Sequence, residues 1–287
     1  MLYLILSILI SSSLFVIFKL FDVFKINTLQ AIVTNYLVAF TIGFSLSESS
    51  VEIQQIPSQP WFLGAVLLGF LFISVFNVMA LTAQKNGLSV ASVSGKMSVV
   101  IPIIFGVFAY NESLNFVKVL GVLLALIAVY LTSMKEVKLT NQKSYLLYPI
   151  LLFLGSGIID TSIKYVETTF VPNGEVPIFS ASIFLIAFCI GLCIVLYAVL
   201  IKKETFEFKN IIGGIVLGIP NYFSIAFLLK ALKTKGLESS TLFTINNVSI
   251  VLLTTLFGLI IFKEKLLTKN WIGIVTAIVS IIIVALA

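Results

Sequence analysis

The stretch FGVFAYNESLNFVKVLG, residues 105–121, returns in altered form as FGLIIFKEKLLTKNWIG at residues 257–273. The two copies share a Phe-Gly pair at the start, a glutamate in the middle and a glycine at the end. They lie within two longer segments, 93–131 and 245–283, that align without a gap. Similarity at one fixed offset within a chain indicates a duplication. The sequence therefore predicts a fold built from two similar halves.

The composition predicts that these halves lie in a membrane. The 287 residues are 60% hydrophobic, the mean hydropathy is +1.17, and only 10% of the residues are charged. A soluble domain has roughly 25% charged residues, so this chain lacks the polar surface that a globule in water needs. The net charge of +6 comes from lysine alone, because the sequence has no arginine and no histidine. Lysines between apolar runs suit lipid headgroups, and the sequence offers no basic soluble domain that would bind nucleic acid.

Ten apolar runs are long enough, or nearly so, to cross a bilayer as helices, which takes about 20 residues each. The first run has no charged start and no cleavage site, so we interpret it as a retained helix and not as a signal peptide. The expected spans are Leu2–Phe21, Leu29–Ser45, Trp61–Ala83, Leu88–Tyr110, Leu114–Thr132, Tyr145–Tyr165, Pro177–Ile201, Asn210–Leu232, Glu238–Phe262 and Thr268–Ala287.

A lysine-containing segment, residues 133–144, lies near the middle of the chain and is expected to be a linker. It separates residues 1–132 from residues 145–287, with five predicted helices on either side. An odd number of spans places the second copy upside down relative to the first. Inverted repeats are a recurrent plan of secondary transporters, whose substrate sites lie near the midplane between the copies. We therefore expect an all-α membrane protein with ten transmembrane helices in two inverted five-helix repeats.

The repeated residues resemble those of a known family, the EamA-type members of the drug/metabolite transporter superfamily. The resemblance implies a ten-helix transporter that moves small metabolites or drugs through a central cavity, with both termini in the cytoplasm. The residues that carry it are Ala80-Leu81, Gly87, Pro102, Tyr110–Leu114 and Gly121 in the first half, and Ala231-Leu232, Gly236, Phe262–Leu266 and Gly273 in the second.

Two charged residues inside predicted spans, Lys96 and Asp160, are candidates for a role in transport. Lys96 lies eight residues into its run, about 12 Å deep at 1.5 Å per residue. A charge at that depth costs roughly 2.5–3.5 kcal/mol, so Lys96 either anchors an anionic group of a substrate, titrates a proton, or is structural and snorkels outward or forms a pair. Asp160 is either a proton-coupling group or the partner of Lys164, because the i,i+4 spacing pairs charges on a helix.

Amides and one tyrosine within the spans complete the candidate substrate-binding set. Such side chains either bond between helices or line a cavity. The glycines at 213, 214 and 218 and a proline at 220 precede one of them, and Gly/Pro-interrupted segments point to binding regions. With Lys96, the candidate residues are Asn77, Asn221, Tyr222, Asn246 and Asn247, the last two of which align with Ser94-Gly95.

The other polar residues of the spans are expected to be structural. Lys19 and Lys164 occupy matching helix ends and suit interfacial anchors. Glu112 and Glu264 stand at equivalent turns, where a helix N-terminus favours a carboxylate. The only two cysteines, at 189 and 193, are expected to be packing residues.

The alternatives to a secondary transporter are an intramembrane enzyme and a carrier of lipid-linked substrates. An enzyme would need a nucleophile with a base, paired acids or a metal, and the sequence has no histidine and a single intramembrane aspartate. We expect no catalytic residues, metal site or cofactor, and there is no P-loop.

The expected location is the cell membrane, as a multi-pass protein of a bacterial inner membrane. The tally of about five lysines on the terminal side against about twelve on the other favours termini outside, opposite to the resemblance. Orientation, solute, direction, coupling and the choice between monomer and dimer are left open.

Overall fold

The structure is a computed structural model that describes residues 2–46, 53–110, 116–134, 143–172, 174–232 and 239–285. Within these ranges every regular element is a helix. The helices are α1 (Leu2–Val23), α2 (Thr28–Ser45), η1 (Ile53–Ser58), α3 (Phe62–Lys85), α4 (Leu88–Met97), α5 (Val100–Tyr110), α6 (Phe116–Ser133), α7 (Lys143–Phe170), α8 (Val176–Leu200), α9 (Phe208–Leu232), α10 (Ser239–Ile260) and α11 (Thr268–Ala285).

Within the described residues, seven segments are long and apolar enough to cross a membrane. Three shorter apolar helices, Val119–Ser133, Ile245–Ile260 and Thr268–Ile283, occupy the predicted fifth, ninth and tenth spans. Many large apolar side chains on these helices face outward, including Phe116 at 80% and Leu63 at 79% exposure. An apolar surface of this extent is disfavoured in water and matches lipid. The chain is therefore an all-helical, multi-pass membrane protein.

One predicted span is wrong in its continuity. The run expected as a single helix from Leu88 to Tyr110 consists of α4 and α5, with turns at Ser98 and Val99 between them. Pro102 explains the break, since a proline donates no backbone hydrogen bond and its ring clashes with the carbonyl four residues earlier, that of Ser98. The Ser98 carbonyl instead accepts from the Ile101 amide at 2.9 Å. The second half has Thr254 at the position of Pro102, and α10 is unbroken there.

The helices form two compact units. The first comprises residues 1–20, 78–158 and 223–287, and the second comprises residues 21–77 and 159–222. Each unit therefore takes segments from both halves of the sequence. The expected boundary between the halves, at residues 133–144, falls largely on residues 135–142, outside the described part of the chain.

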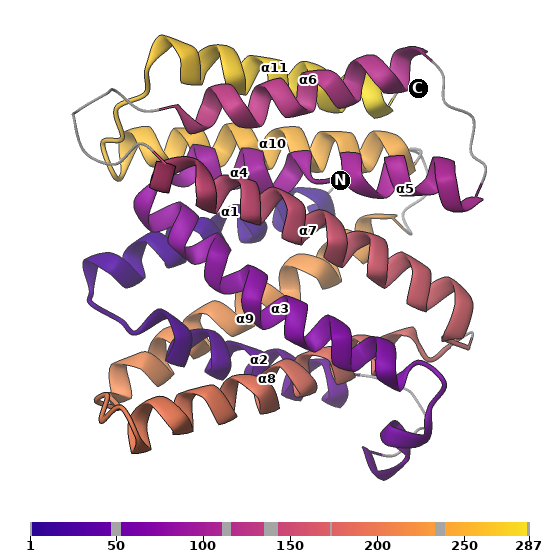
Figure 1. Cartoon of the computed structure of the whole chain (residues 1–287), viewed down its shortest axis with the longest axis vertical. Helices are drawn as coiled ribbons and strands as arrows, with labels where there is room; N and C mark the ends of the chain where they lie inside the picture. The colour runs from indigo at the N-terminus through magenta and orange to yellow at the C-terminus, as the bar shows by residue number, and fades with distance from the viewer. Residues whose placement is uncertain are drawn as a thin grey trace. The chain divides into compact units, whose positions relative to one another are not determined.

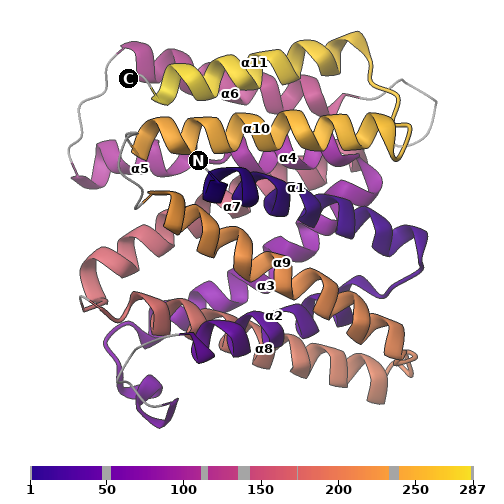
Figure 2. The ribbon, with the colours of Figure 1, turned by 180° about the vertical axis from the view of Figure 1, so that it is seen from behind.

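In the first unit, α6 packs against α11 and α4 packs against α10, as Figures 1 and 2 both show. The buried core between these four helices consists of small and aliphatic side chains together with Phe153 of α7. Its members include Val93 and Met97 of α4, Ala125 of α6, Val251 of α10 and Ile274 of α11. In a bilayer such side chains stabilise the helix contacts by close van der Waals packing and not by removal from water.

In the second unit, α2 packs against α8 (Figure 1). Trp61, fully buried, anchors the start of α3 in this unit: its indole nitrogen donates to a carboxylate oxygen of Glu175 at 3.1 Å, and its ring meets Phe179 of α8 edge-on. A buried tryptophan needs such a partner for its N–H group.

The pairings relate equivalent helices of the two predicted repeats. Counted along each half, α2 and α8 are the second helices, α4 and α10 belong to the fourth, and α6 and α11 are the fifth. Each of these helices packs against its own counterpart. A two-fold axis produces contacts of this kind, in which the same surface of both copies meets itself.

Candidate functional site

Helices α4 and α10 of the first unit are antiparallel neighbours, and two hydrogen bonds fix their register. Near the start of α4, the Leu88 amide donates to both carboxylate oxygens of Glu264, at 3.0 and 3.2 Å, just beyond the end of α10. One turn along α4, the Thr254 hydroxyl donates to the Ser92 hydroxyl oxygen at 2.7 Å, with both residues fully buried.

This register brings Asn246 and Asn247 of α10 level with the break between α4 and α5. Ser98 lies six residues beyond Ser92, and Asn247 lies seven residues before Thr254, which is roughly 9 and 10 Å along the two axes. Lys96 is half-buried in the last turn of α4, beside the break. The structure therefore places Lys96, Asn246 and Asn247 within one stretch of the same helix pair.

Helix α1 contributes a further polar contact at Asn246. The Ser7 hydroxyl lies 3.3 Å from the Asn246 side-chain oxygen and 3.1 Å from the backbone carbonyl oxygen of Ser224 in α9. Ser7 is fully buried and Asn246 is 2% exposed. The Ser7 hydroxyl therefore lies between the Asn246 side chain and the α9 backbone, and this contact gives the buried amide a polar partner.

Three buried hydroxyls of the first unit have no hydrogen-bond partner within the described residues. They belong to Ser12 of α1 and to Ser89 and Ser94 of α4. Leaving a buried hydroxyl unpaired costs about 1–3 kcal/mol. Ser94 aligns with Asn246 and lies two residues before Lys96 in the same helix.

Glu264 is a structural group, as the sequence predicts, but it stabilises a different helix end from the one expected. Its carboxylate accepts from the first amide of α4, next to Gly87, whose φ of +107° favours glycine. A methyl group on Gly258 would lie 2.6 Å from the carboxylate, so this glycine leaves the space that the side chain occupies. The equivalent Glu112 lies outside the described residues.

In the second unit, Asn221 belongs to a buried contact between α2 and α9. Its side-chain amide donates to the side-chain oxygen of Asn35 at 3.1 Å, and both residues are less than 5% exposed. Pro220 does not interrupt α9, which continues from Phe208 to Leu232. Gly214 and Gly218 allow α2 to approach, because a Cβ at either position would lie within 3 Å of α2 atoms. The predicted role of Asn221 in substrate binding stays a prediction.

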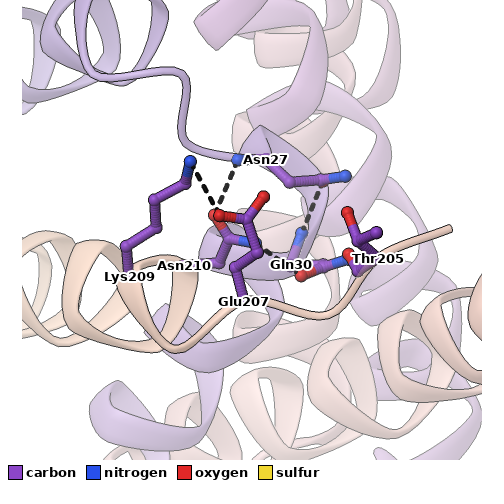
Figure 3. A network of polar contacts seen from close by, with 6 residues as sticks. All are labelled: Asn27, Gln30, Thr205, Glu207, Lys209 and Asn210. Atoms are coloured by element: carbon purple, nitrogen blue, oxygen red, sulfur yellow. Dashed lines mark hydrogen bonds and ion pairs between the residues drawn. The ribbon is translucent and has the colours of Figure 1, made fainter.

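A second set of amides joins the same two helices near the start of each (Figure 3). The buried Asn210 side chain donates to the Gln30 side-chain oxygen at 2.7 Å and accepts from the Asn27 backbone amide at 2.9 Å. Gln30 in turn donates to the Thr205 carbonyl at 3.0 Å. Beside this network lies the exposed ion pair of Glu207 and Lys209. These contacts pair buried polar groups with one another and serve packing.

The other predicted residues occupy varied surroundings. Asn77 donates to the Ile73 carbonyl at 2.7 Å, within its own helix. The Tyr222 ring packs against Gly43 of α2. Asp160 and Lys164 are exposed on α7, and the predicted pairing between them stays a prediction. Lys19 donates to the Gln84 carbonyl at 2.7 Å.

Sequence reasoning missed three residues that the structure singles out. Ser7, Asn35 and Gln30 are buried and hydrogen-bonded across helices. The signal was present, because a polar side chain in an apolar span must find a partner or a cavity. Their partners could not be found without the helix pairing.

Comparison with known proteins finds a family that the first part of the chain resembles. The model of the EamA-like transporter family matches residues 1–134. The match covers 134 of the 287 residues. The repeated residues indicate a resemblance to the EamA-type family. The match confirms this resemblance for residues 1–134, from α1 to the end of α6.

Two whole-chain similarities accompany the EamA-like match. An uncharacterized protein of Haemophilus influenzae is 29% identical over 287 residues, covering 97% of this chain and 95% of the relative. A crystal structure of another protein superposes with a TM-score of 0.63, covering 99% of this chain and 96% of that one, at 15% identity. At that identity the superposition concerns the fold alone. The chain is a multi-pass membrane protein whose residues 1–134 are similar to the EamA-like transporter family.

Proposed function

We propose that this protein is a secondary transporter that carries small metabolites or drugs across a bacterial inner membrane by alternating access. Its ten apolar segments would all cross the bilayer, in two inverted five-helix repeats. The bacterial origin of its Haemophilus influenzae relative supports this location.

The pairing of equivalent helices is the observation that carries this proposal. Second, fourth and fifth helices of the two halves each pack against their own counterparts. That pattern is expected where a pseudo-two-fold axis relates two inverted copies, and substrate sites of such transporters lie near the axis. The α4–α10 pair carries polar residues in the middle of both members.

The break between α4 and α5 favours an anionic group as part of the solute. The positive end of the α5 helix dipole lies at this break, although the Ile101 and Ile103 amides already donate to the Ser98 and Val99 carbonyls. The ammonium group of Lys96 adds a full positive charge one turn away. We infer that Lys96 anchors a carboxylate or phosphate of the solute, and that Asn246 and Asn247 contact its uncharged polar groups.

A thermal-shift screen followed by counterflow tests the proposal. Purified protein is heated with amino acids, organic acids, nucleosides, sugars and cationic drugs, since a ligand of the folded state raises the melting temperature by mass action. A solute that stabilises the protein is then loaded into proteoliposomes, and uptake of the same labelled solute is followed. Intact labelled solute inside the vesicles supports a carrier, whereas chemical conversion of the solute would establish an enzyme.

The variant Lys96→Gln tests the proposed anchoring role of Lys96 separately from transport itself. Lys202→Gln is the control for an exposed lysine. An anionic ligand whose thermal shift is lost only in Lys96→Gln supports the anchor. If a cation or neutral solute shows counterflow that Lys96→Gln leaves unchanged, the proposed transport function is supported and the proposed anchoring role of Lys96 is refuted. The proposed coupling role of Asp160 predicts that Asp160→Asn abolishes proton-driven accumulation but retains counterflow.

A further inference from the structure

The last turn of α4 contains a glycine beside open space. At Gly214 and Gly258 the space is filled, since an added Cβ would lie within 3 Å of other atoms. At Gly95 no atom lies within 4 Å of the same Cβ. Gly95 is partly exposed, although Ala91 and Ser98, one turn away on either side, are no more than 1% exposed. The space is therefore a narrow recess in an otherwise buried face of α4.

The Gly95 recess lies on the side of α4 that faces α10. Gly95 and Lys96 follow Ser92 by three and four residues, and residues at these spacings share one face of a helix. Ser92 marks the face in contact with α10, because its hydroxyl oxygen accepts from the Thr254 hydroxyl at 2.7 Å. Asn247 precedes Thr254 by seven residues, which is two turns of α10, and so faces α4 from the opposite wall.

The repeat indicates the size of the group that the Gly95 recess would hold. Gly95 and Asn247 occupy equivalent positions in the two aligned segments, 93–131 and 245–283. Where α10 carries a –CH₂–CONH₂ side chain, α4 leaves the corresponding space open. A –CH₂–CO₂⁻ group has the same planar shape and nearly the same size as that side chain. A carboxylate at the end of a solute therefore matches the recess, whereas a tetrahedral phosphate is bulkier.

The recess also lies close to the expected symmetry axis. In the register that the hydroxyl contact sets, Met97 of α4 and Ser249 of α10 are both equivalent in the repeat and level with each other. A pseudo-two-fold axis would cross the pair at this point, and Gly95 lies two residues from it, about 3 Å along the helix. Substrate sites of inverted repeats lie near such an axis. Lys96, which follows Gly95 directly, supplies an ammonium group that pairs well with a carboxylate.

We propose that the Gly95 recess determines solute specificity: it takes the carboxylate of a small solute, which Lys96 binds, and excludes a phosphate. The uncharged polar part of the solute then points to Asn247, about 6 Å further along the helix pair. This inference rests on the proposed transport function and narrows the anionic group of the solute to a carboxylate.

Thiol labelling tests the recess without knowledge of the solute. The only two cysteines, Cys189 and Cys193, are replaced by alanine, and Gly95→Cys is introduced. In proteoliposomes, an anionic methanethiosulfonate (sulfonatoethyl) and a cationic one (trimethylammonioethyl) modify only thiols that water reaches, because charged groups avoid hydrocarbon. We expect both to modify Gly95→Cys, the anionic reagent faster. The matched control is Leu123→Cys, 53% exposed on α6, which should react with neither.

The charge of Lys96 should set the preference between the two reagents. In Lys96→Gln, the ratio of the anionic to the cationic rate at Gly95→Cys should fall about tenfold, the scale of a unit charge a few ångströms away at a partly solvated site. Lys202→Gln, at an exposed lysine beyond the end of α8, should leave this ratio unchanged.

Thermal shifts test the choice of carboxylate. The probes are glycolate and glycerate, compared with methyl phosphate and glycerol phosphate at equal ionic strength, and the carboxylates should stabilise the wild-type protein more. Gly95→Asn and Gly95→Leu fill the recess, so both should lose the shift with carboxylates. Without ligand, both should melt at or above the wild-type temperature, because the space is open and glycine is unfavourable within a helix.

Three results would overturn the proposal: Gly95→Cys reacts with the anionic reagent no faster than Leu123→Cys, carboxylates stabilise the protein no more than phosphates, or Gly95→Asn keeps the full carboxylate shift. If the filled variants do not fold, the labelling decides. Counterflow of a solute that Gly95→Leu leaves unchanged would refute the recess and support transport. A carboxylate shift that is lost in Gly95→Asn, without counterflow of that carboxylate, would support the recess and refute transport.

Discussion

Removal of the Glu264 carboxylate should destabilise the first unit measurably. The Leu88 amide donates to both oxygens of this group, at 3.0 and 3.2 Å. A hydrogen bond to a charged partner is worth about 1.5–3 kcal/mol, and loss of a helix cap costs about 0.5–2 kcal/mol. We expect Glu264→Ala to cost about 2 kcal/mol, which lowers the melting temperature by roughly 4–8 °C for a protein of this size.

The assay is thermal unfolding in detergent, with two further variants. Glu264→Gln keeps an acceptor but loses the charge, so about half of the effect is expected. Glu207→Ala is the control: the Glu207–Lys209 pair is 2.9 Å long, but its side chains are 42–49% exposed, and such surface pairs contribute about 0–1 kcal/mol. If Glu264→Ala unfolds at the wild-type temperature, or Glu207→Ala shifts it as far, the capping argument fails.

Three other predictions concern packing and the helix break. Asn35→Leu and Asn221→Leu should each cost about 1–3 kcal/mol by orphaning a buried amide, and the double variant should cost less than their sum in a thermal double-mutant cycle. Gly214→Val should destabilise the protein by about 1–3 kcal/mol, because even a Cβ there would lie 2.5 Å from the backbone carbonyl of Ala31. Gly95→Ala, with open space around it, should leave the melting temperature unchanged or raise it. Pro102→Thr should protect the amides of residues 98–101 from hydrogen exchange. Unchanged exchange would show that the proline does not cause the helix break.

The helical architecture could be predicted from the sequence because span length and composition depend on local properties. Each expected run contains a helix, with ends shifted by a few residues. The break at Ser98–Val99 was missed although Pro102 was identified, because a proline within a span either kinks or breaks a helix according to the packing around it. Pro220 shows the other outcome, since α9 continues through it.

The candidate site was only partly accessible from sequence. The alignment of Asn246-Asn247 with Ser94-Gly95 indicated that polar residues recur at one level, and α4 and α10 do pack together. Asn221 gave the same signal as Asn246, yet its amide contacts Asn35 of α2. Sequence marks the polar positions of a span but cannot name their partners, because these depend on which helices are neighbours.

The two halves differ where their polar residues are concentrated, and this difference bears on mechanism. The first half has a broken helix with a lysine, whereas the second half has an unbroken helix with two asparagines. Ser92 and Thr254 join α4 to α10, while Ile101 of α5 packs closely against Gly157 of α7. Beyond the break, α5 has this additional contact with α7, while its first residues, Val100 and Ile101, pack in the same core as α4 and α10. A rearrangement of α5 with α7 would therefore move one wall of the proposed site and would also repack the start of α5 against that core, a change with no counterpart in the unbroken α10.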